Sequence, residues 1–346
     1  MNIPKSFASD NNSGVHPLVM KALSDVNQGH YIGYGDDPYT EIAKSKFREL
    51  LGENIEVFFV YNGTGANSVI INTVTRSYNS VICPVTSHIN VDECGAPGAA
   101  SGCKIEFVDA PDGKMTPELV NSMLLGIGFE HHSQPKVVSI TQSTELGTLY
   151  SISELRELCD FCHDNNLLVH MDGARISNAA VALNCTFKEM TADVGIDVLS
   201  FGGTKNGLMF GETVVFFKTE LAEDFKYFRK QNMQLHSKMR YISAQFTALL
   251  TDNLWYKNAK HANDMAQFLH RELANVEGIQ ITRPCYVNSV FAILPKEVIP
   301  SLQQIYFFYI WDEHTHEVRF MTTFDTTKED IDHFIAALKD ELRNRK

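Results

Sequence analysis

Seven short apolar runs recur along the first two thirds of the chain, and they constrain its fold more than any other feature. The runs lie at residues 57–61, 80–83, 104–108, 136–141, 167–171, 197–201 and 213–217. Each has the length of a strand, and helical patterns lie between them. Strands that alternate with helices are typical of βαβ units. We therefore expect an α/β fold whose large domain has a mainly parallel seven-stranded sheet with helices on both faces.

The pattern changes after the seventh run. Longer helical patterns follow, and residues 287–294 and 317–321 are expected as strands of a smaller α+β domain. The run 305–311 is expected as a buried or interface strand. A chain of 346 residues is long enough for two domains. The expected division is an N-terminal segment that contributes to the active site and the interface (1–45), a large cofactor-binding domain (46–250) and a small C-terminal domain (251–346).

Two helices carry clear end signals. Asp37 as N-cap, Pro38 in the first turn and Gly52 past the end frame one helix. Ser151 and Glu154 form the capping box of a second. The sequence Cys-Asp-Phe-Cys-His inside this second helix has the form of a haem attachment site. Four residues of the helix, including both cysteines, fall on one apolar stripe and are instead expected in the core: Leu155, Leu158, Cys159 and Cys162.

Charge and cysteine usage exclude several classes of function. The formal charge of −12, from 42 acidic and 30 basic side chains, argues against nucleic acid or an anionic membrane as partner. No apolar run approaches the roughly 20 residues that span a bilayer, and residues 1–12 lack the pattern of a secretory signal. Seven cysteines without a pairing pattern fit a reducing cytoplasm. His314 and His316 are expected on the solvated face of a strand, so no metal site is expected.

Lys205 is the first candidate for chemistry. It follows the apolar run 197–201 and stands among small residues, directly after Gly202, Gly203 and Thr204. Partial desolvation favours the neutral form of an amine, and a neutral amine can attack a carbonyl to form a Schiff base. Pyridoxal phosphate (PLP) is the natural partner of such a lysine. An isolated lysine of this kind can also simply cap a loop, so the neighbouring motifs decide.

Three further motifs favour the PLP hypothesis. Asp172 ends the run 167–171, at the sheet edge where ligands bind in α/β proteins, and its carboxylate can keep a pyridine nitrogen protonated. Gly63, Thr64 and Gly65 lie between a strand and a helix, where backbone N–H groups can hold a phosphate; Thr204 is a possible hydroxyl donor to it. His88 follows a strand, so it could lie over the ring and act as acid or base.

Taken together, these motifs resemble the threonine aldolase group of the β-eliminating lyase family, PLP enzymes with the aspartate-aminotransferase fold (fold type I). The resemblance covers most of the chain. It is carried by Ser9-Asp10, Tyr34-Gly35-Asp36-Asp37-Pro38, Asn62-Gly63-Thr64-Gly65-Ala66-Asn67, Ser87-His88-Ile89-Asn90, His170-Met171-Asp172-Gly173-Ala174-Arg175, Thr204-Lys205 and Val318-Arg319-Phe320.

The resemblance implies a role for each matching residue. Lys205 would form the Schiff base with PLP, Asp172 would pair with the ring nitrogen, and His88 would stack on the ring. The substrate carboxylate would be bound by Ser9, Arg175 and Arg319, with Arg175 also beside the cofactor. A basic residue between positions 228 and 240 would reach the phosphate of a neighbouring subunit, and Arg240 is our candidate. The family further implies a homo-oligomer, a dimer or a tetramer, whose active site is shared between subunits.

Two departures from the family pattern affect the substrate and the base. The N-terminal motif continues as Asn11-Asn12-Ser13-Gly14-Val15-His16, in place of the threonine-rich continuation of many threonine aldolases. Glu145 stands where better-known members carry a histidine near the substrate. The leading hypothesis is retro-aldol cleavage of a β-hydroxy-α-amino acid, of the L-threonine or L-allo-threonine type, to glycine and an aldehyde. The base is left open between His88, Glu145, a water and the cofactor phosphate. The alternatives are β-elimination from cysteine or serine, releasing pyruvate and ammonia, and a PLP-binding protein without turnover.

Overall fold

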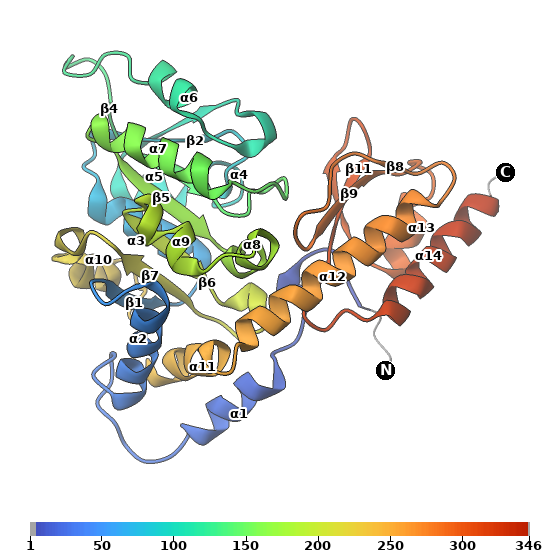
Figure 1. The fold of residues 1–346 in the computed structure, drawn as a ribbon, viewed down its shortest axis with the longest axis horizontal. Helices are drawn as coiled ribbons and strands as arrows, with labels where there is room; N and C mark the ends of the chain where they lie inside the picture. The colour runs from blue at the N-terminus through green and yellow to red at the C-terminus, as the bar shows by residue number, and fades with distance from the viewer. Residues whose placement is uncertain (1–4, 345–346) are drawn as a thin grey trace.

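The computed structural model describes residues 5–344 and has a large α/β part and a smaller part with its own sheet (Figure 1). The large sheet has seven strands in the order β1-β7-β6-β5-β4-β2-β3. Its strands are β1 (Glu56–Val60), β2 (Asn79–Pro84), β3 (Lys104–Val108), β4 (Gln134–Thr141), β5 (Leu168–Gly173), β6 (Val198–Gly202) and β7 (Glu212–Phe216). All seven apolar runs of the sequence therefore form strands, within a residue or two of the expected bounds.

The sheet is mainly parallel, as expected. Strands β6, β5, β4, β2 and β3 run parallel, whereas β7 pairs antiparallel with both β6 and β1. Successive side chains point to opposite faces of a sheet. Val81 and Val137 accordingly pack on the face covered by α3 (Gly63–Val74) and α10 (Phe225–Gln231). Their neighbours Ile82 and Val138 pack on the other face. Helices on both faces bury the sheet and confirm the predicted fold class.

The second face is covered by helices whose ends match the sequence signals. Asp37 caps α2 (Pro38–Leu51) by accepting the N–H of Thr40, and Gly52 ends it. Ser151 and Glu154 form the expected capping box of α7 (Ile152–Asp164), and its four predicted stripe residues are buried. The remaining helices of the large part are α1 (Pro17–Asp25), α4 (His88–Val91), α5 (Ala96–Ser101), α6 (Pro117–Ser122), α8 (Ile176–Leu183), α9 (Phe187–Met190) and α11 (Arg240–Leu250).

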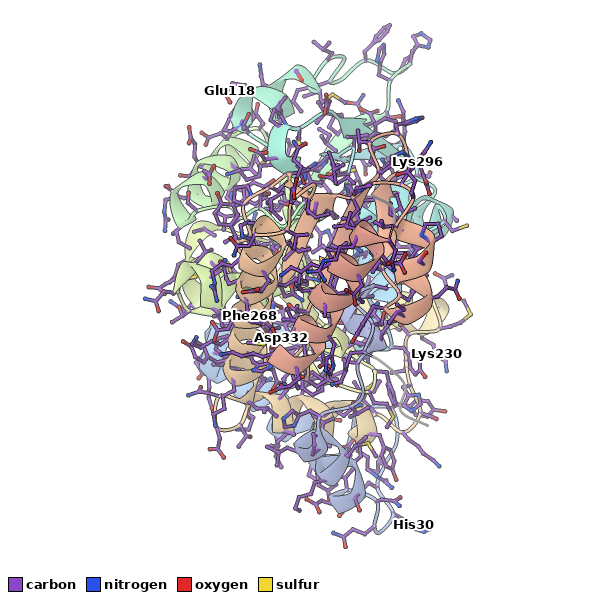
Figure 2. All side chains as sticks on the ribbon, turned by 90° about the vertical axis from the view of Figure 1, so that its right-hand side faces the viewer. His30, Glu118, Lys230, Phe268, Lys296 and Asp332 are labelled. Carbon is purple, nitrogen blue, oxygen red and sulfur yellow. The ribbon has the colours of Figure 1, made fainter. Side chains whose placement is uncertain are left out.

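The small part is built on an antiparallel sheet in the order β10-β11-β9-β8. Its strands are β8 (Gln280–Ile281), β9 (Ser289–Ile293), β10 (Tyr309–Asp312) and β11 (Glu317–Met321). Helices α12 (Leu254–Ala274), α13 (Ile299–Ile305) and α14 (Lys328–Arg343) pack with this sheet. Figure 2 shows α12, with Phe268, beside α14, with Asp332.

Two expectations for the small part are wrong. The run 305–311 is not one strand, because α13 ends at Ile305 and β10 begins only at Tyr309. Its aromatic side chains divide between core and solvent, and a run of apolar letters does not reveal that division. His314 and His316 do not lie on a strand face. They occupy the turn between β10 and β11, where Asp312 accepts the N–H of His314.

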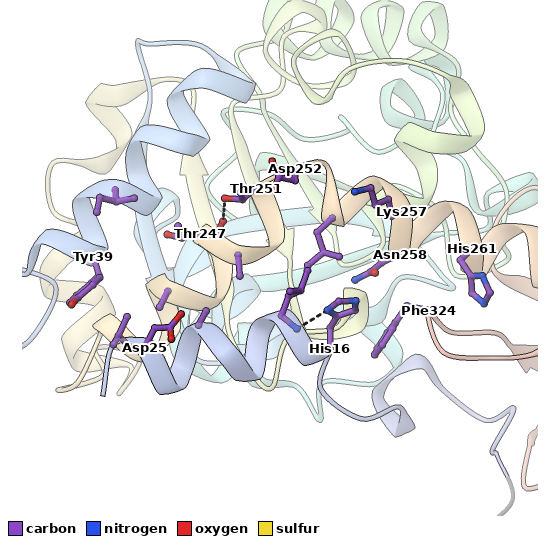
Figure 3. Close-up of a pocket in the computed structure, with 17 residues that line it drawn as sticks. His16, Asp25, Tyr39, Thr247, Thr251, Asp252, Lys257, Asn258, His261 and Phe324 are labelled. Carbon is purple, nitrogen blue, oxygen red and sulfur yellow. Dashed lines mark hydrogen bonds between the residues drawn. The ribbon is translucent and has the colours of Figure 1, made fainter. Parts of the chain in front are cut away.

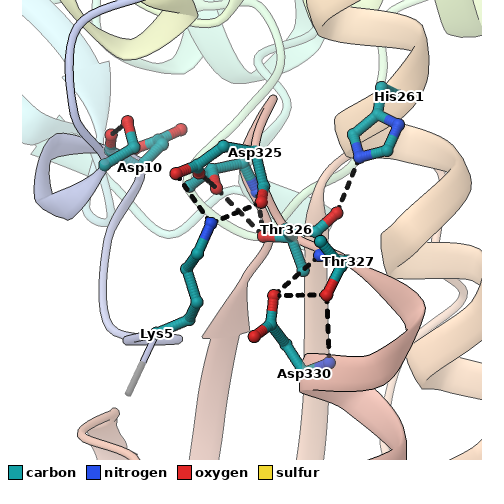
Figure 4. Close-up of polar contacts among 9 residues, drawn as sticks. Lys5, Asp10, His261, Asp325, Thr326, Thr327 and Asp330 are labelled. Atoms are coloured by element: carbon teal, nitrogen blue, oxygen red, sulfur yellow. Dashed lines mark hydrogen bonds and ion pairs between the residues drawn. The ribbon is translucent and has the colours of Figure 1, made fainter. Parts of the chain in front are cut away.

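Polar contacts join the N-terminal segment and α12 to the small part (Figure 4). Lys5 forms an ion pair with Asp325 at 2.8 Å, and His261 of α12 contacts the carbonyl of Thr326. The N-terminal part of α12, from Leu254 to His261, also lines a groove together with α1, α2 and α11 (Figure 3). His16 lies in this groove and caps α1 by accepting the N–H of Leu18.

The division at residues 45 and 250 stays a prediction. Position 45 lies inside α2, and position 250 is the last residue of α11. Among residues 5–344, none of the helices combines the length and the apolar character that crossing a bilayer requires.

Candidate active site

A pocket opens beside the carboxyl ends of β4, β5 and β6, where the sequence placed its candidates. Parallel strands gather their carboxyl ends at one edge of the sheet, so residues far apart in sequence meet there. The pocket is lined by Gly63, Asn67, His88, Glu93, Thr141, Ser143, Glu145, Asp172, Ala174, Arg175 and Lys205.

Lys205 reaches this pocket from a tight turn after β6. Two glycines make the turn possible, because a Cβ at Gly202 would lie 2.3 Å from the carbonyl oxygen of Ala174, and a Cβ at Gly203 would lie 2.8 Å from that of Gly211. Burial, and then the nearby positive charge of Arg175, lower the pKa of Lys205. The lowered pKa increases the share of neutral amine, the form that can attack a carbonyl.

Asp172 ends β5 with both carboxylate oxygens engaged. Oδ1 accepts the N–H of Ala174 at 2.9 Å, and Oδ2 accepts the amide of Asn67 at 2.8 Å. Burial alone would raise the pKa of Asp172, but Lys205 and the Asn67 hydrogen bond outweigh burial and lower it. The carboxylate is therefore ionised and could hold a protonated ring nitrogen.

His88 begins the short helix α4 and is held by a residue that the sequence analysis missed. Its Nδ1 lies 2.8 Å from Oε1 of Glu93, whose side chain is fully buried. The Glu93 contact raises the pKa of His88 against the opposing effect of burial. The sequence shows an acidic residue five positions after the histidine, but a single acidic residue in a sequence does not indicate that its side chain is buried.

Glu145 lies in the loop after β4, beside His88. Its Oε1 accepts the backbone N–H of His88 and the hydroxyl of Thr141, both at 2.8 Å. Its Oε2 is buried and has no hydrogen-bond partner within residues 5–344. Burial raises the pKa of Glu145. The pocket thus contains a carboxylate oxygen that is free to take a proton from a bound molecule.

Two guanidinium groups lie close together near the pocket. Arg175 donates through Nε and Nη2 to Asp10, at 2.7 and 2.8 Å, and its Nη1 is not part of this pair. Arg319 lies over the ring of Trp311, 4.7 Å from its centroid, and its Nε is buried without a partner among the described residues. Burial, and then Arg175, lower the pKa of Arg319 to about 10. Two adjacent cations of this kind form a site for an anion such as a carboxylate.

The glycine-rich turn begins α3 at the rim of the pocket. Asn62 caps this helix by accepting the N–H of Gly65 at 2.7 Å. The amide of Gln234 packs directly against Gly65, where a Cβ would lie 2.3 Å from it. Gly63 lines the pocket, and Thr64 follows it on the first turn of α3. The N-terminus of α3 can therefore receive an anion at the edge of the pocket.

Six candidates lie outside the pocket lining: Thr64, Gly65 and Arg319, described above, and Ser9, Thr204 and Arg240. Ser9 caps a short 3₁₀ turn by accepting the N–H of Asn11, and its neighbour Asp10 is the residue that contacts Arg175. The hydroxyl of Thr204 faces the carbonyl of Gly211 at 3.4 Å. Arg240 begins α11 and lies 5.4 Å from the ring centroid of Tyr31, in a separate surface depression.

Comparison with known proteins gives consistent matches over nearly the whole chain. The family model for beta-eliminating lyase matches residues 6–297. A low specificity L-threonine aldolase of a Pseudomonas species is 42% identical over 323 residues, 93% of each chain. The enzyme of that name from Pseudomonas aeruginosa is 41% identical over 328 residues, 94% of this chain and 95% of the relative. The solved structure of Leishmania major threonine aldolase superposes with a TM-score of 0.91 at 29% identity, covering 97% of this chain and 99% of that one.

Proposed function

The chain belongs to the beta-eliminating lyase family, and from this premise we propose that it is a PLP-dependent aldehyde-lyase. The proposed reaction is retro-aldol cleavage of a β-hydroxy-α-amino acid, of the L-threonine or L-allo-threonine type, to glycine and an aldehyde. The observation that carries the proposal is the convergence of three groups on one pocket: the Lys205 amine, the Asp172 carboxylate and Oε2 of Glu145, which has no hydrogen-bond partner within residues 5–344. The names of the two Pseudomonas relatives support the same reaction.

The pocket fits PLP at each of its functional groups. Lys205 offers an amine of lowered pKa to the aldehyde, and Asp172 offers an ionised carboxylate to the ring nitrogen. The start of α3, at Gly63 and Thr64, offers backbone N–H groups to the phosphate. His88 offers a ring face. When bound, PLP supplies an electron sink for the pair released at the substrate Cα.

The substrate carboxylate is assigned to Arg175 and Arg319. Asp10 engages two nitrogens of Arg175 and thereby fixes its plane, which leaves Nη1 for the substrate. Arg319 is stacked on Trp311, and its buried Nε has no hydrogen-bond partner within residues 5–344. Fixing a carboxylate between two guanidinium groups restricts how the rest of the substrate is oriented, and orientation alone can contribute greatly to rate.

The β-hydroxyl proton is assigned to Glu145. Since Oε1 is committed to His88 and Thr141, the proton would go to Oε2. The raised pKa of Glu145 brings this carboxylate closer to the operating pH, which suits a general base. His88, whose ring also lines the pocket, is the second candidate for this proton transfer.

A panel of amino acids tests the reaction. Purified protein, reconstituted with PLP, is incubated with L-threonine, L-allo-threonine, L-serine and L-cysteine while aldehyde, pyruvate and ammonia are measured in parallel. We expect acetaldehyde and glycine from at least one threonine isomer. Pyruvate from cysteine or serine without any aldehyde would replace the proposal with β-elimination. Borohydride reduction followed by peptide mapping should find the cofactor on Lys205, and its absence there would refute the assigned lysine.

We further propose that the protein is a homodimer or homotetramer with shared active sites. Arg240 supports this, because its guanidinium lies at the surface against Tyr31 and Tyr241, away from the pocket. If Arg240 serves a neighbour's site, hybrids of Lys205→Ala and Arg240→Ala chains contain one intact site. A random mixture then recovers about a quarter of wild-type activity. Confirmed hybrids without recovery would refute shared sites.

A cytoplasmic location is proposed from the seven unpaired cysteines.

A further inference from the structure

A continuous set of polar side chains in the pocket lining joins His88 to Asp172. Nδ1 of His88 lies 2.8 Å from Oε1 of Glu93. The amide nitrogen of Asn67 donates to that same Oε1 and to Oδ2 of Asp172, both at 2.8 Å. Asn67 is 1% exposed and the Glu93 side chain is 0% exposed, so water does not compete for these contacts. One amide group therefore bridges two buried carboxylates.

The bridge determines the proton positions on the next residues. Both amide hydrogens of Asn67 are used by carboxylates, so its Oδ1 must accept the hydroxyl of Ser200 at 2.7 Å. The Ser200 oxygen, having given its only hydrogen, then accepts from Nε2 of His170 at 3.1 Å. Nδ1 of His170 in turn accepts from Ser139 at 2.9 Å. This requires a neutral His170, and burial indeed lowers the pKa of His170 to about 4.

The proton position on His88 follows from its contact with Glu93. Burial raises the pKa of Glu93, and the hydrogen bonds from His88 and Asn67 oppose that effect. In its ionised form Glu93 can only accept, so Nδ1 of His88 then carries the hydrogen that points at Glu93. The second ring nitrogen of His88 has no hydrogen-bond partner among residues 5–344 and is left for the pocket. Glu93 thus selects the protonation state of one nitrogen and frees the other. A carboxylate that orients a histidine in this way is a recurring device in enzymes.

We propose that Glu93 is a positioning residue that fixes the Nδ1–H form of His88, and that Asn67 ties this imidazole to Asp172, so that both groups facing the cofactor share one frame. This inference rests on the proposed function, because the frame matters only if His88 and Asp172 face PLP. The charged groups around His88 are Glu93, Asp172 and Lys205, with Glu145 at its backbone. Among residues 5–344, only Glu93 contacts the ring through a hydrogen bond.

Glu93→Gln tests the first half of the inference. The amide keeps the shape of the side chain and removes its charge. The imidazole signal of His88 is followed by NMR in cofactor-free protein over a pH series, and it is identified by its loss in His88→Asn. We expect its titration midpoint to move to lower pH in Glu93→Gln, because the contact that raises it is weakened. Glu130→Gln makes the same chemical change at a side chain that is 88% exposed and should leave the midpoint unchanged. An unchanged midpoint in a folded Glu93→Gln protein would overturn the assignment.

Asn67→Ala tests the second half. It leaves the pair of His88 and Glu93 in place and cuts the tie to Asp172. The His88 midpoint should stay close to that of the wild type, whereas PLP should bind about tenfold or more weakly, the effect expected for one lost hydrogen bond to a charged group. Unchanged PLP affinity would overturn the tie. The NMR titration does not depend on turnover. A wild-type protein that releases no aldehyde would therefore refute the proposed function, whereas an unchanged His88 midpoint in Glu93→Gln would refute the role of Glu93.

Discussion

The pair of Asp10 and Arg175 allows a prediction whose size follows from the structure. Asp10 is 1% exposed and receives two hydrogen bonds from Arg175, at 2.7 and 2.8 Å, and a third from Asn288 of the small part at 3.1 Å. Asp10→Asn keeps the shape of the side chain and removes its charge. It leaves the buried guanidinium without its counter-ion, and an unpaired buried charge is strongly unfavourable.

Two estimates of the cost agree. Removal of one partner from a buried ion pair typically costs about 3–5 kcal/mol. Unit charges about 4 Å apart interact by about 4 kcal/mol at an effective dielectric constant of 20. With about 2.1 cal/mol/K per residue, a chain of 346 residues has an unfolding entropy of about 0.7 kcal/mol/K. A loss of about 4 kcal/mol therefore lowers the melting temperature by about 5–6 °C.

Differential scanning calorimetry of the cofactor-free protein at pH 7 measures this shift. The matched control is Asp25→Asn, which breaks the exposed pair of Asp25 and Lys21 at 2.6 Å. That pair is expected to contribute only about 0.3–0.5 kcal/mol, which corresponds to less than about 1 °C. If Asp10→Asn melts within about 1 °C of Asp25→Asn, the reasoning about the buried pair is wrong.

The pH dependence gives the prediction a second check. Burial alone would raise the pKa of Asp10, but Arg175, followed by Lys205, lowers it below the ordinary value of 3.8. A carboxyl group with a lowered folded pKa stabilises the protein above its unfolded pKa and loses that contribution as the pH falls through the folded value. The difference between wild type and Asp10→Asn should therefore be complete at neutral pH and shrink below about pH 4. A difference that grows on acidification would contradict this sign.

Three further predictions concern the pocket and its supports. Glu145→Gln should lower kcat for threonine cleavage by about 10²–10⁴-fold while PLP still binds, as measured by steady-state kinetics and absorbance titration; retention of full kcat would transfer the proton to another group. Gly202→Ala should destabilise the fold by about 3 kcal/mol, because its Cβ would meet the backbone carbonyl of Ala174 at 2.3 Å. Gly14→Ala is its control in thermal melts, because a Cβ there would have no atom of residues 5–344 within 4 Å. Burial raises the pKa of Glu212 to about 7 from 4.5, so wild-type stability should fall as the pH rises from about 4.5 to 7. Glu212→Gln should lack this decline in cofactor-free protein, and parallel curves for the two proteins would refute it.

The strands and the central candidates were predictable because they depend on local sequence. A buried strand needs an apolar run, so β1 to β7 appear in the sequence directly. Lys205 and Asp172 follow such runs, and the carboxyl ends of parallel strands meet at one edge. The sequence therefore predicted that these two residues share a pocket, and they line the same one.

The supporting residues were not predictable, because their burial depends on distant partners. Asp10 is 165 positions from Arg175, and Asn67 is 105 positions from Asp172. The neighbouring sequence does not indicate that Asp10 or Asn67 is buried. From the sequence alone, each could equally be an ordinary surface residue. Glu93 is close to His88 in sequence, but only the tertiary structure makes it a buried acceptor.

Helix α12 connects the large part and the small part through two hydrogen bonds near the pocket. Asn258 donates to the carbonyl of Asn206, the residue after Lys205, at 2.9 Å. One turn later, the carbonyl of Ala262 accepts the hydroxyl of Thr322, just beyond the strand of Arg319, at 2.7 Å. A helical turn has a fixed rise of about 5.4 Å. The helix therefore fixes the spacing between the segments that carry Lys205 and Arg319. One extra residue between positions 258 and 262 would rotate Asn258 relative to Ala262 by about 100° about the helix axis, so one of the two hydrogen bonds would be lost.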